Sequence, residues 1–125
     1  MPVQVGLYVE SQEGVTWDDW RAAAEQAEAL GFDALACSVH LRSLEGRRGW
    51  RLDLWPVMTA VALWTERIRF GPLVLPVTFY HPAQIARAAA ALDHLSGGRF
   101  QLALGAGRDV TEHRAFALPF PPHDE

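Results

Sequence analysis

The chain has 125 residues, half of them apolar and about a fifth charged, and its net charge is −4 at pH 7. This composition is typical of a single globular domain; it excludes a disordered or fibrous protein and offers no basic stripe for nucleic acid. The longest apolar stretch, residues 54–64, is too short to cross a bilayer, and the N-terminus lacks the basic and apolar regions of a signal peptide.

The first half of the chain alternates between apolar runs and helical periodicity. A strand is predicted over residues 3–9, followed by a helix over 16–31 that begins with the capping-box pattern Thr-x-x-Asp and ends at a glycine. A second strand is predicted over 34–39. After a polar loop, Asp53 is the expected N-cap of a helix over 54–65.

The second half repeats the alternation. A third strand is predicted over 68–75, followed by a helix over 81–98 that begins with His-Pro and ends with Ser-Gly-Gly. A fourth strand, 100–104, leads into a glycine turn. The pattern Asp109-x-x-Glu112 indicates the cap of a fourth helix, which ends before the prolines near the C-terminus.

The spacing of the four strands determines the fold class. Apolar runs begin near residues 3, 34, 68 and 100, and a repeat of about 30 residues is the size of one βα unit with a right-handed crossover. Two α/β architectures share this pattern, the doubly wound open sheet and the (β/α)8 barrel. A complete barrel needs about 250 residues, so a barrel of this type would be present only as its first four βα units, a half-barrel.

The glycine turn at residues 105–107 is a candidate binding site. A strand, a glycine turn and a helix start favour an anion, because free backbone N–H groups and the helix dipole point at it. The dinucleotide fingerprint G-x-G-x-x-G fails here, since Val110 stands in place of the third glycine. No acidic residue lies at the ribose-binding distance either, which disfavours a nucleotide-binding open sheet.

Several blocks of the sequence resemble one known family. GFDALACSVH (31–40), ERIRFGPLVLPVTFYHPAQIARAAAALDHLSGGRF (66–100) and LGAGRDVTEHRAFALPF (104–120) resemble the luciferase-like monooxygenase superfamily, most closely its F420-dependent oxidoreductase branch. The resemblance implies a (β/α)8 TIM barrel with a reduced flavin or deazaflavin at the C-terminal end of the strands. It also implies that residues 1–125 form the N-terminal half of that barrel domain.

The resemblance assigns roles to three parts of the chain. His40 matches the catalytic position just past the second strand. This chain has Val39-His40 there, whereas F420-dependent relatives usually have Asp-His. An imidazole there can exchange a proton during hydride transfer. Many relatives have a non-proline cis peptide bond in the third strand that backs the cofactor ring, and the matching bond joins Leu73 to Val74. The expected cofactor contacts of the glycine turn are Gly105, Ala106, Gly107 and Arg108.

Other chemically capable residues are interpreted as structural. The single cysteine, Cys37, lies in an apolar strand with no base at a recognisable spacing, so we expect a core residue and a reducing, cytoplasmic location. The remaining histidines lack metal-ligand spacing, and no metal site is predicted; they are His81, His94, His113 and His123.

The predicted function is that of a flavin- or F420-dependent oxidoreductase acting on a small organic substrate by hydride transfer. Coenzyme F420 is the expected cofactor and FMN the alternative, in which case reduced FMN would activate oxygen in a monooxygenase. A non-catalytic half-barrel, kept as a remnant or assembly module, is the rival from a different class. A half-barrel also predicts either a homo-oligomer or a missing C-terminal half, because its edge strands would be open.

Overall fold

The computed structural model describes residues 3–120 and confirms the predicted alternation of strands and helices. In chain order the elements are β1 (Gly6–Val9), α1 (Trp17–Ala29), β2 (Ala34–Cys37), α2 (Leu54–Trp64), β3 (Arg69–Pro72), β4 (Leu75–Pro76), α3 (Pro82–Ser96), β5 (Leu104–Gly105) and α4 (Val110–Ala115).

The strands are parallel and lie in chain order. β1, β2 and β3 form one sheet, and β4 pairs with β5 in a second. β3 and β4 are the two parts of the third predicted strand, interrupted at the cis peptide bond between Leu73 and Val74. A parallel bridge between Phe70 and Phe100 also joins the fourth predicted strand to β3. The two sheets are therefore contiguous.

Three predicted strands are shorter than the apolar runs that suggested them, and the second of these ends at Cys37 rather than at residue 39. The first begins at Gly6 rather than at residue 3. The fourth was expected over 100–104, but only Phe100 and β5 are paired, and β5 includes Gly105. The third strand is interrupted at residues 73–74. The fourth strand therefore pairs with the third only before and after that interruption.

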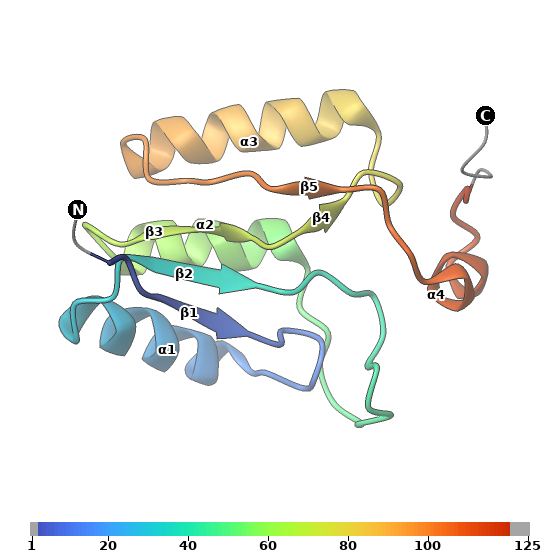
Figure 1. Ribbon diagram of the computed structural model, residues 1–125, viewed down its shortest axis with the longest axis horizontal. Helices are drawn as coiled ribbons and strands as arrows, with labels where there is room; N and C mark the ends of the chain where they lie inside the picture. The colour runs from blue at the N-terminus through green and yellow to red at the C-terminus, as the bar shows by residue number, and fades with distance from the viewer. Residues whose placement is uncertain (1–2, 121–125) are drawn as a thin grey trace.

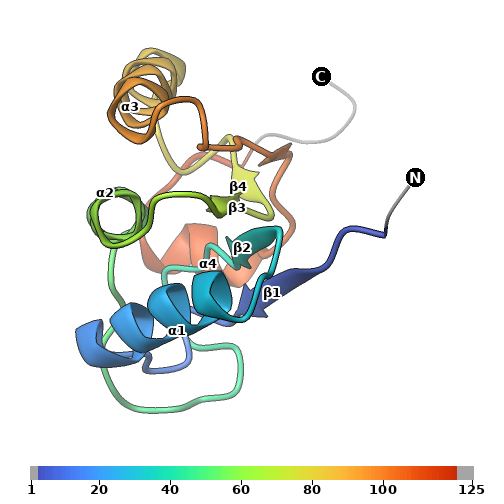
Figure 2. The same ribbon diagram turned by 90° about the vertical axis from the view of Figure 1, so that its left-hand side faces the viewer.

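The helices α1, α2 and α3 all pack against one face of the strands, as Figures 1 and 2 show. Their contact with the sheet forms the hydrophobic core, whose largest fully buried members include Trp20, Leu35, Met58, Ile68 and Phe70. Within residues 3–120 no helix covers the opposite face (Figure 2). No helix in that part of the chain is long and apolar enough to span a membrane.

Local signals set the helix ends as predicted. Thr16 and Asp19 form a capping box, and the Asp53 side chain accepts a hydrogen bond from the backbone N–H of Trp55. His81 caps α3, and Gly97 ends it in the left-handed conformation (φ 67°). Each cap satisfies backbone groups that a helix end leaves unpaired. Each helix therefore stops where its loop must return to the sheet.

The strand ends define the functional edge of the molecule. All strands point in the same direction, and α4 lies beyond their carboxyl ends (Figure 1). The loops that follow β2, β4 and β5 meet there. In α/β proteins with parallel strands this edge is where ligands bind.

Candidate functional site

An open pocket of about 310 Å³ lies at the carboxyl ends of the strands. Its volume is near the lower end of the range for small-molecule sites, about 300–1,000 Å³. All seven residues that the sequence singled out line this pocket: His40, Leu73, Val74, Gly105, Ala106, Gly107 and Arg108. The fold thus brings together three segments that are far apart in the chain.

The glycine turn after β5 lies directly against the interrupted third strand. A Cβ atom at Gly105 would stand 2.5 Å from Cγ2 of Val74, closer than non-bonded carbon atoms approach. Gly107 has φ +84°, a conformation that favours glycine. Both positions therefore require glycine, and the backbone of the turn is left open toward the pocket.

The Leu73–Val74 segment presents apolar side chains to the pocket. Leu73 is 56% exposed and Val74 40% exposed, although both follow a buried strand. The Tyr8 hydroxyl donates a hydrogen bond of 3.3 Å to the carbonyl oxygen of Leu73. Burial, together with the nearby charge of Glu10, raises the pKa of Tyr8, which keeps this donor protonated. The pocket thus has an apolar surface beside the glycine turn.

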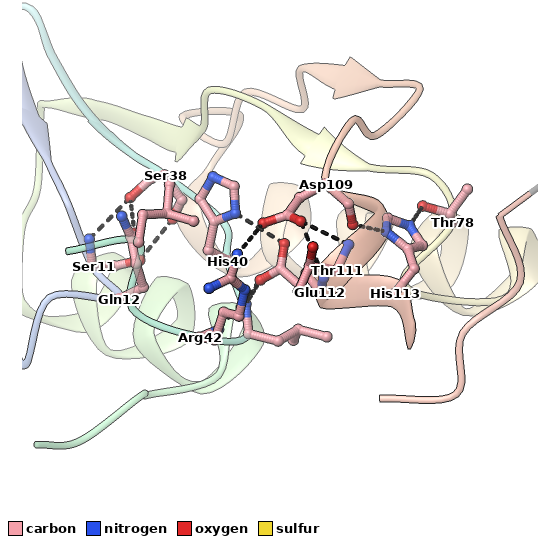
Figure 3. A network of polar contacts seen from close by, with 12 residues as sticks. Ser11, Gln12, Ser38, His40, Arg42, Thr78, Asp109, Thr111, Glu112 and His113 are labelled. Atoms are coloured by element: carbon pink, nitrogen blue, oxygen red, sulfur yellow. Dashed lines mark hydrogen bonds and ion pairs between the residues drawn. The ribbon is translucent and has the colours of Figure 1, made fainter. Parts of the chain in front are cut away.

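His40 enters the pocket from the loop after β2. Its Nδ1 atom lies 3.0 Å from Oε2 of Glu112, and 18% of the His40 side chain is exposed. The Glu112 side chain is only 1% exposed. Its other oxygen, Oε1, accepts hydrogen bonds from the backbone N–H groups of Leu41 and of Arg42, the latter at 3.2 Å (Figure 3). One carboxylate on α4 thus holds both the histidine and the backbone that follows it.

A second contact joins the same two segments. The Arg42 guanidinium forms an ion pair of 2.7 Å with Asp109, whose side chain also caps α4 by accepting from the N–H groups of Thr111 and Glu112 (Figure 3). The backbone N–H of Glu112, and then the Arg42 charge, hold the pKa of Asp109 below its usual value. The loop after β2 is therefore fixed to the start of α4 by two acidic residues.

His113 closes the other end of the pocket. It is 1% exposed, its Nε2 atom lies 2.6 Å from Oγ1 of Thr78, and its Nδ1 atom lies 2.7 Å from the carbonyl oxygen of Asp109. Because a carbonyl can only accept, Nδ1 donates to it. The buried histidine thus connects α4 to the loop after β4 (Figure 3).

Sequence reasoning missed three of the residues that line the site. Glu112 is the expected capping partner of Asp109, yet its carboxylate turns away from the cap toward residues 40–42. His113 was set aside for lack of metal-ligand spacing, and Tyr8 was considered only as part of the first strand. One local signal could have drawn attention to Glu112 and His113. They are adjacent polar residues near the start of a short helix.

The other residues that the sequence analysis considered, Cys37, His81 and His94, do not line the pocket. Cys37 is buried, and burial raises the pKa of its thiol to about 12, as expected for a core residue. His81 caps α3 and His94 is exposed, while His123 lies outside the described residues. Within residues 3–120 no three His, Cys, Asp or Glu side chains are grouped to hold a metal ion.

Comparison with known proteins agrees with this geometry. The family described as luciferase-like monooxygenase matches residues 2–125. An F420-dependent glucose-6-phosphate dehydrogenase from Beutenbergia cavernae is 35% identical over 119 residues, which is 94% of this chain and 35% of that protein. An F420-dependent hydroxymycolic acid dehydrogenase from Mycobacterium tuberculosis is 35% identical over 106 residues, or 84% of this chain and 29% of the relative.

Solved structures show the same similarity. A monooxygenase from Streptomyces bottropensis superimposes with a TM-score of 0.80 at 25% identity, covering 94% of this chain and 37% of that one. The chain therefore spans about a third of the length of the proteins it matches. With a family match over nearly all of its residues and parallel strands that end in one pocket, the chain belongs to the luciferase-like monooxygenase family.

Proposed function

We propose that this chain supplies the cofactor pocket and the proton-transferring histidine of an F420-dependent oxidoreductase acting on a small organic substrate. The observation that carries the proposal is the grouping of His40, the Leu73–Val74 segment and the glycine turn 105–108 around one pocket. The F420-dependent dehydrogenases among the relatives support the choice of cofactor.

The fold proposal is a half-barrel. The parallel strands in chain order, with helices on one face only, are consistent with the first four βα units of a (β/α)8 barrel. Either further chain or a second copy would complete it.

Each part of the pocket has a distinct role in this proposal. Leu73, Val74 and the backbone of residues 105–107 would contact the flat ring of the cofactor, and Arg108 lies where it can contact the cofactor or substrate. When bound, F420 supplies the hydride chemistry. His40 takes up or returns the substrate proton as a general base or acid.

A second candidate is an FMN-dependent monooxygenase. It is favoured by the similarity to the Streptomyces bottropensis monooxygenase and by the family itself. It is also favoured by Val39, which stands where F420-dependent relatives usually have aspartate. The same apolar segment and glycine turn would then contact the FMN ring.

A binding titration distinguishes the candidates. We expect the purified chain to quench F420 fluorescence on binding, with a lower Kd for F420 than for FMN. Tighter binding of FMN would replace the first candidate with the second, and binding of neither would favour the non-catalytic half-barrel. Val74→Glu should abolish binding by placing a charge against the ring. Val77→Glu is the matched control, because Val77 is equally exposed (41%) but does not line the pocket.

A further inference from the structure

We propose that Glu112 is a positioning residue for His40: it fixes the imidazole with its proton on Nδ1 and leaves Nε2 free to accept a proton in the pocket. This inference rests on the proposed function, since it assigns the atom through which His40 acts. It comes from the arrangement of residues 40–42 around one buried carboxylate (Figure 3).

The Glu112 carboxylate has a fixed orientation. Glu112 is 1% exposed, so its oxygens depend on protein donors rather than on water. Oε1 accepts from two successive backbone N–H groups, those of Leu41 and Arg42. With Oε1 held in this way, Oε2 is directed at Nδ1 of His40, 3.0 Å away.

The Glu112 carboxylate also determines which ring nitrogen of His40 carries the proton. A carboxylate oxygen accepts a hydrogen bond, so the ring nitrogen facing it must donate. In a neutral imidazole only one nitrogen carries hydrogen, and Nε2 is then left as the basic nitrogen. Within residues 3–120, Nε2 of His40 has no hydrogen-bond partner, and the ring lines the pocket. The free lone pair is thus available where a substrate proton would be.

Glu112 differs from a carboxylate that only supports the loop. Glu13 also holds the loop after β2, accepting from the Ser43 hydroxyl at 2.5 Å and from the Leu44 N–H at 2.9 Å. Glu13 does not contact His40. Three carboxylates therefore hold this loop, those of Glu13, Asp109 and Glu112, and only that of Glu112 reaches the imidazole.

The test reads the tautomer of His40 directly. In Glu112→Gln, the amide oxygen can keep accepting from the Leu41 and Arg42 N–H groups, but the amide nitrogen then faces His40 and donates. We expect ring ¹⁵N shifts at neutral pH to show the proton on Nδ1 in the unmodified chain and on Nε2 in the variant. Glu13→Gln is the matched control and should leave the proton on Nδ1. In the active enzyme, Glu112→Gln should lower kcat by roughly 100-fold, the lower value for a positioned acid–base group, with little change in KM.

The outcomes separate this inference from the function on which it rests. A proton on Nε2 in the unmodified chain, or the same tautomer in Glu112→Gln as in the control, would overturn the positioning role. Should Glu112→Gln not fold, the spectrum of the unmodified chain still decides. The spectra need neither cofactor nor substrate, so failure to bind F420 would overturn the proposed function while leaving the tautomer result in place.

Discussion

Cys37 and His40 stand three residues apart at the end of β2 and show how burial decides reactivity. The Cys37 side chain points into the core and is 1% exposed, whereas His40 reaches the pocket. A thiol acts as a nucleophile only when it is ionised, and burial disfavours the thiolate. An imidazole can exchange a proton while largely shielded, provided that one nitrogen remains accessible. The two residues therefore have opposite expected chemistry.

Cys37 should be unreactive in the folded protein. Because burial raises the pKa of its thiol to about 12, the thiolate is scarce at pH 7–8. We expect a thiol reagent such as Ellman's reagent to modify Cys37 only as fast as the chain unfolds, and at once in denaturant. Rapid modification under native conditions would contradict the packing of β2 against α1 and α2.

His40 should contribute to turnover rather than to binding. Replacing a positioned acid–base group costs roughly 100- to 10,000-fold in rate. We expect His40→Ala to lower turnover of the active enzyme in that range, while the Kd for the cofactor stays nearly unchanged. A loss in turnover of less than about fivefold would assign His40 to loop structure instead.

At the scale of elements, α4 is a short helix whose position depends on its ends. It has only six residues, and isolated helices of that length are not stable in water. Its first turn is held by the Asp109 cap, the Arg42 ion pair and the contact between Glu112 and the loop after β2. Stability at this end of the molecule should therefore depend on the charge of Asp109.

Asp109→Ala should destabilise the fold at neutral pH by about 1 kcal/mol, the typical value of an N-cap. The pKa of Asp109 is lowered in the folded state, so the unfolded chain takes up its proton first as the pH falls. The stabilisation is complete above about pH 5 and is lost through the unfolded pKa of about 3.9 and below it. Urea unfolding should thus show a larger difference in the free energy of unfolding between variant and unmodified chain at pH 7 than at pH 3.

Asp93→Ala is the control for this measurement. Asp93 is exposed on α3, and its side chain forms no hydrogen bond within residues 3–120. Its removal should change the free energy of unfolding equally little at both pH values. A difference for Asp109→Ala that does not shrink on acidification would show that its charge does not contribute.

Sequence patterns predicted what is determined locally. Thr16 and Asp53 were identified as caps because each finds its partner within three residues. Glu112 was assigned to a cap by the same reasoning, but its carboxylate binds backbone groups 70 and 71 residues earlier in the chain. No local pattern distinguishes these two uses of an acidic residue, because the competing donors become neighbours only after folding.

The same limit applies to the strands and helix faces. The apolar run 100–104 predicts a strand, yet its pairing depends on the interruption of the third strand at residues 73–74. By helical periodicity, Leu30 and Leu95 share a face with the buried residues of their helices, yet they are 76% and 48% exposed. Both lie at the end of a helix, where periodicity continues in the sequence after contact with the sheet has ended.

At the scale of the whole molecule, the sheet has one covered and one uncovered face. Among residues 3–120, β1 pairs only with β2, so its outer edge presents unpaired N–H and C=O groups. Apolar side chains are exposed near both outer strands, namely Val3, Val5, Tyr8, Leu102 and Leu104. Open edges with apolar neighbours favour pairing with another chain.

The 125-residue chain should therefore associate when it is purified alone. We expect light scattering to give a mass above the 13.9 kDa of one chain, because burial of several large apolar side chains contributes roughly 1.5–3 kcal/mol each. Val3→Lys with Val5→Lys should shift the equilibrium toward the monomer by placing charge beside β1. A monodisperse monomer that unfolds cooperatively would contradict the half-barrel proposal and favour a self-sufficient open sheet.

His40 and Glu112 are 72 positions apart in the chain, and this separation also sets an order of events during synthesis. Residues 34–37 can pair with β1 and β3 as soon as those segments leave the ribosome, before α4 emerges from it. Until then the His40 ring has no carboxylate to face and the glycine turn is missing. A nascent chain can thus acquire much of its hydrophobic core while it still lacks a binding site, and a segment that emerges later makes the histidine ready for chemistry.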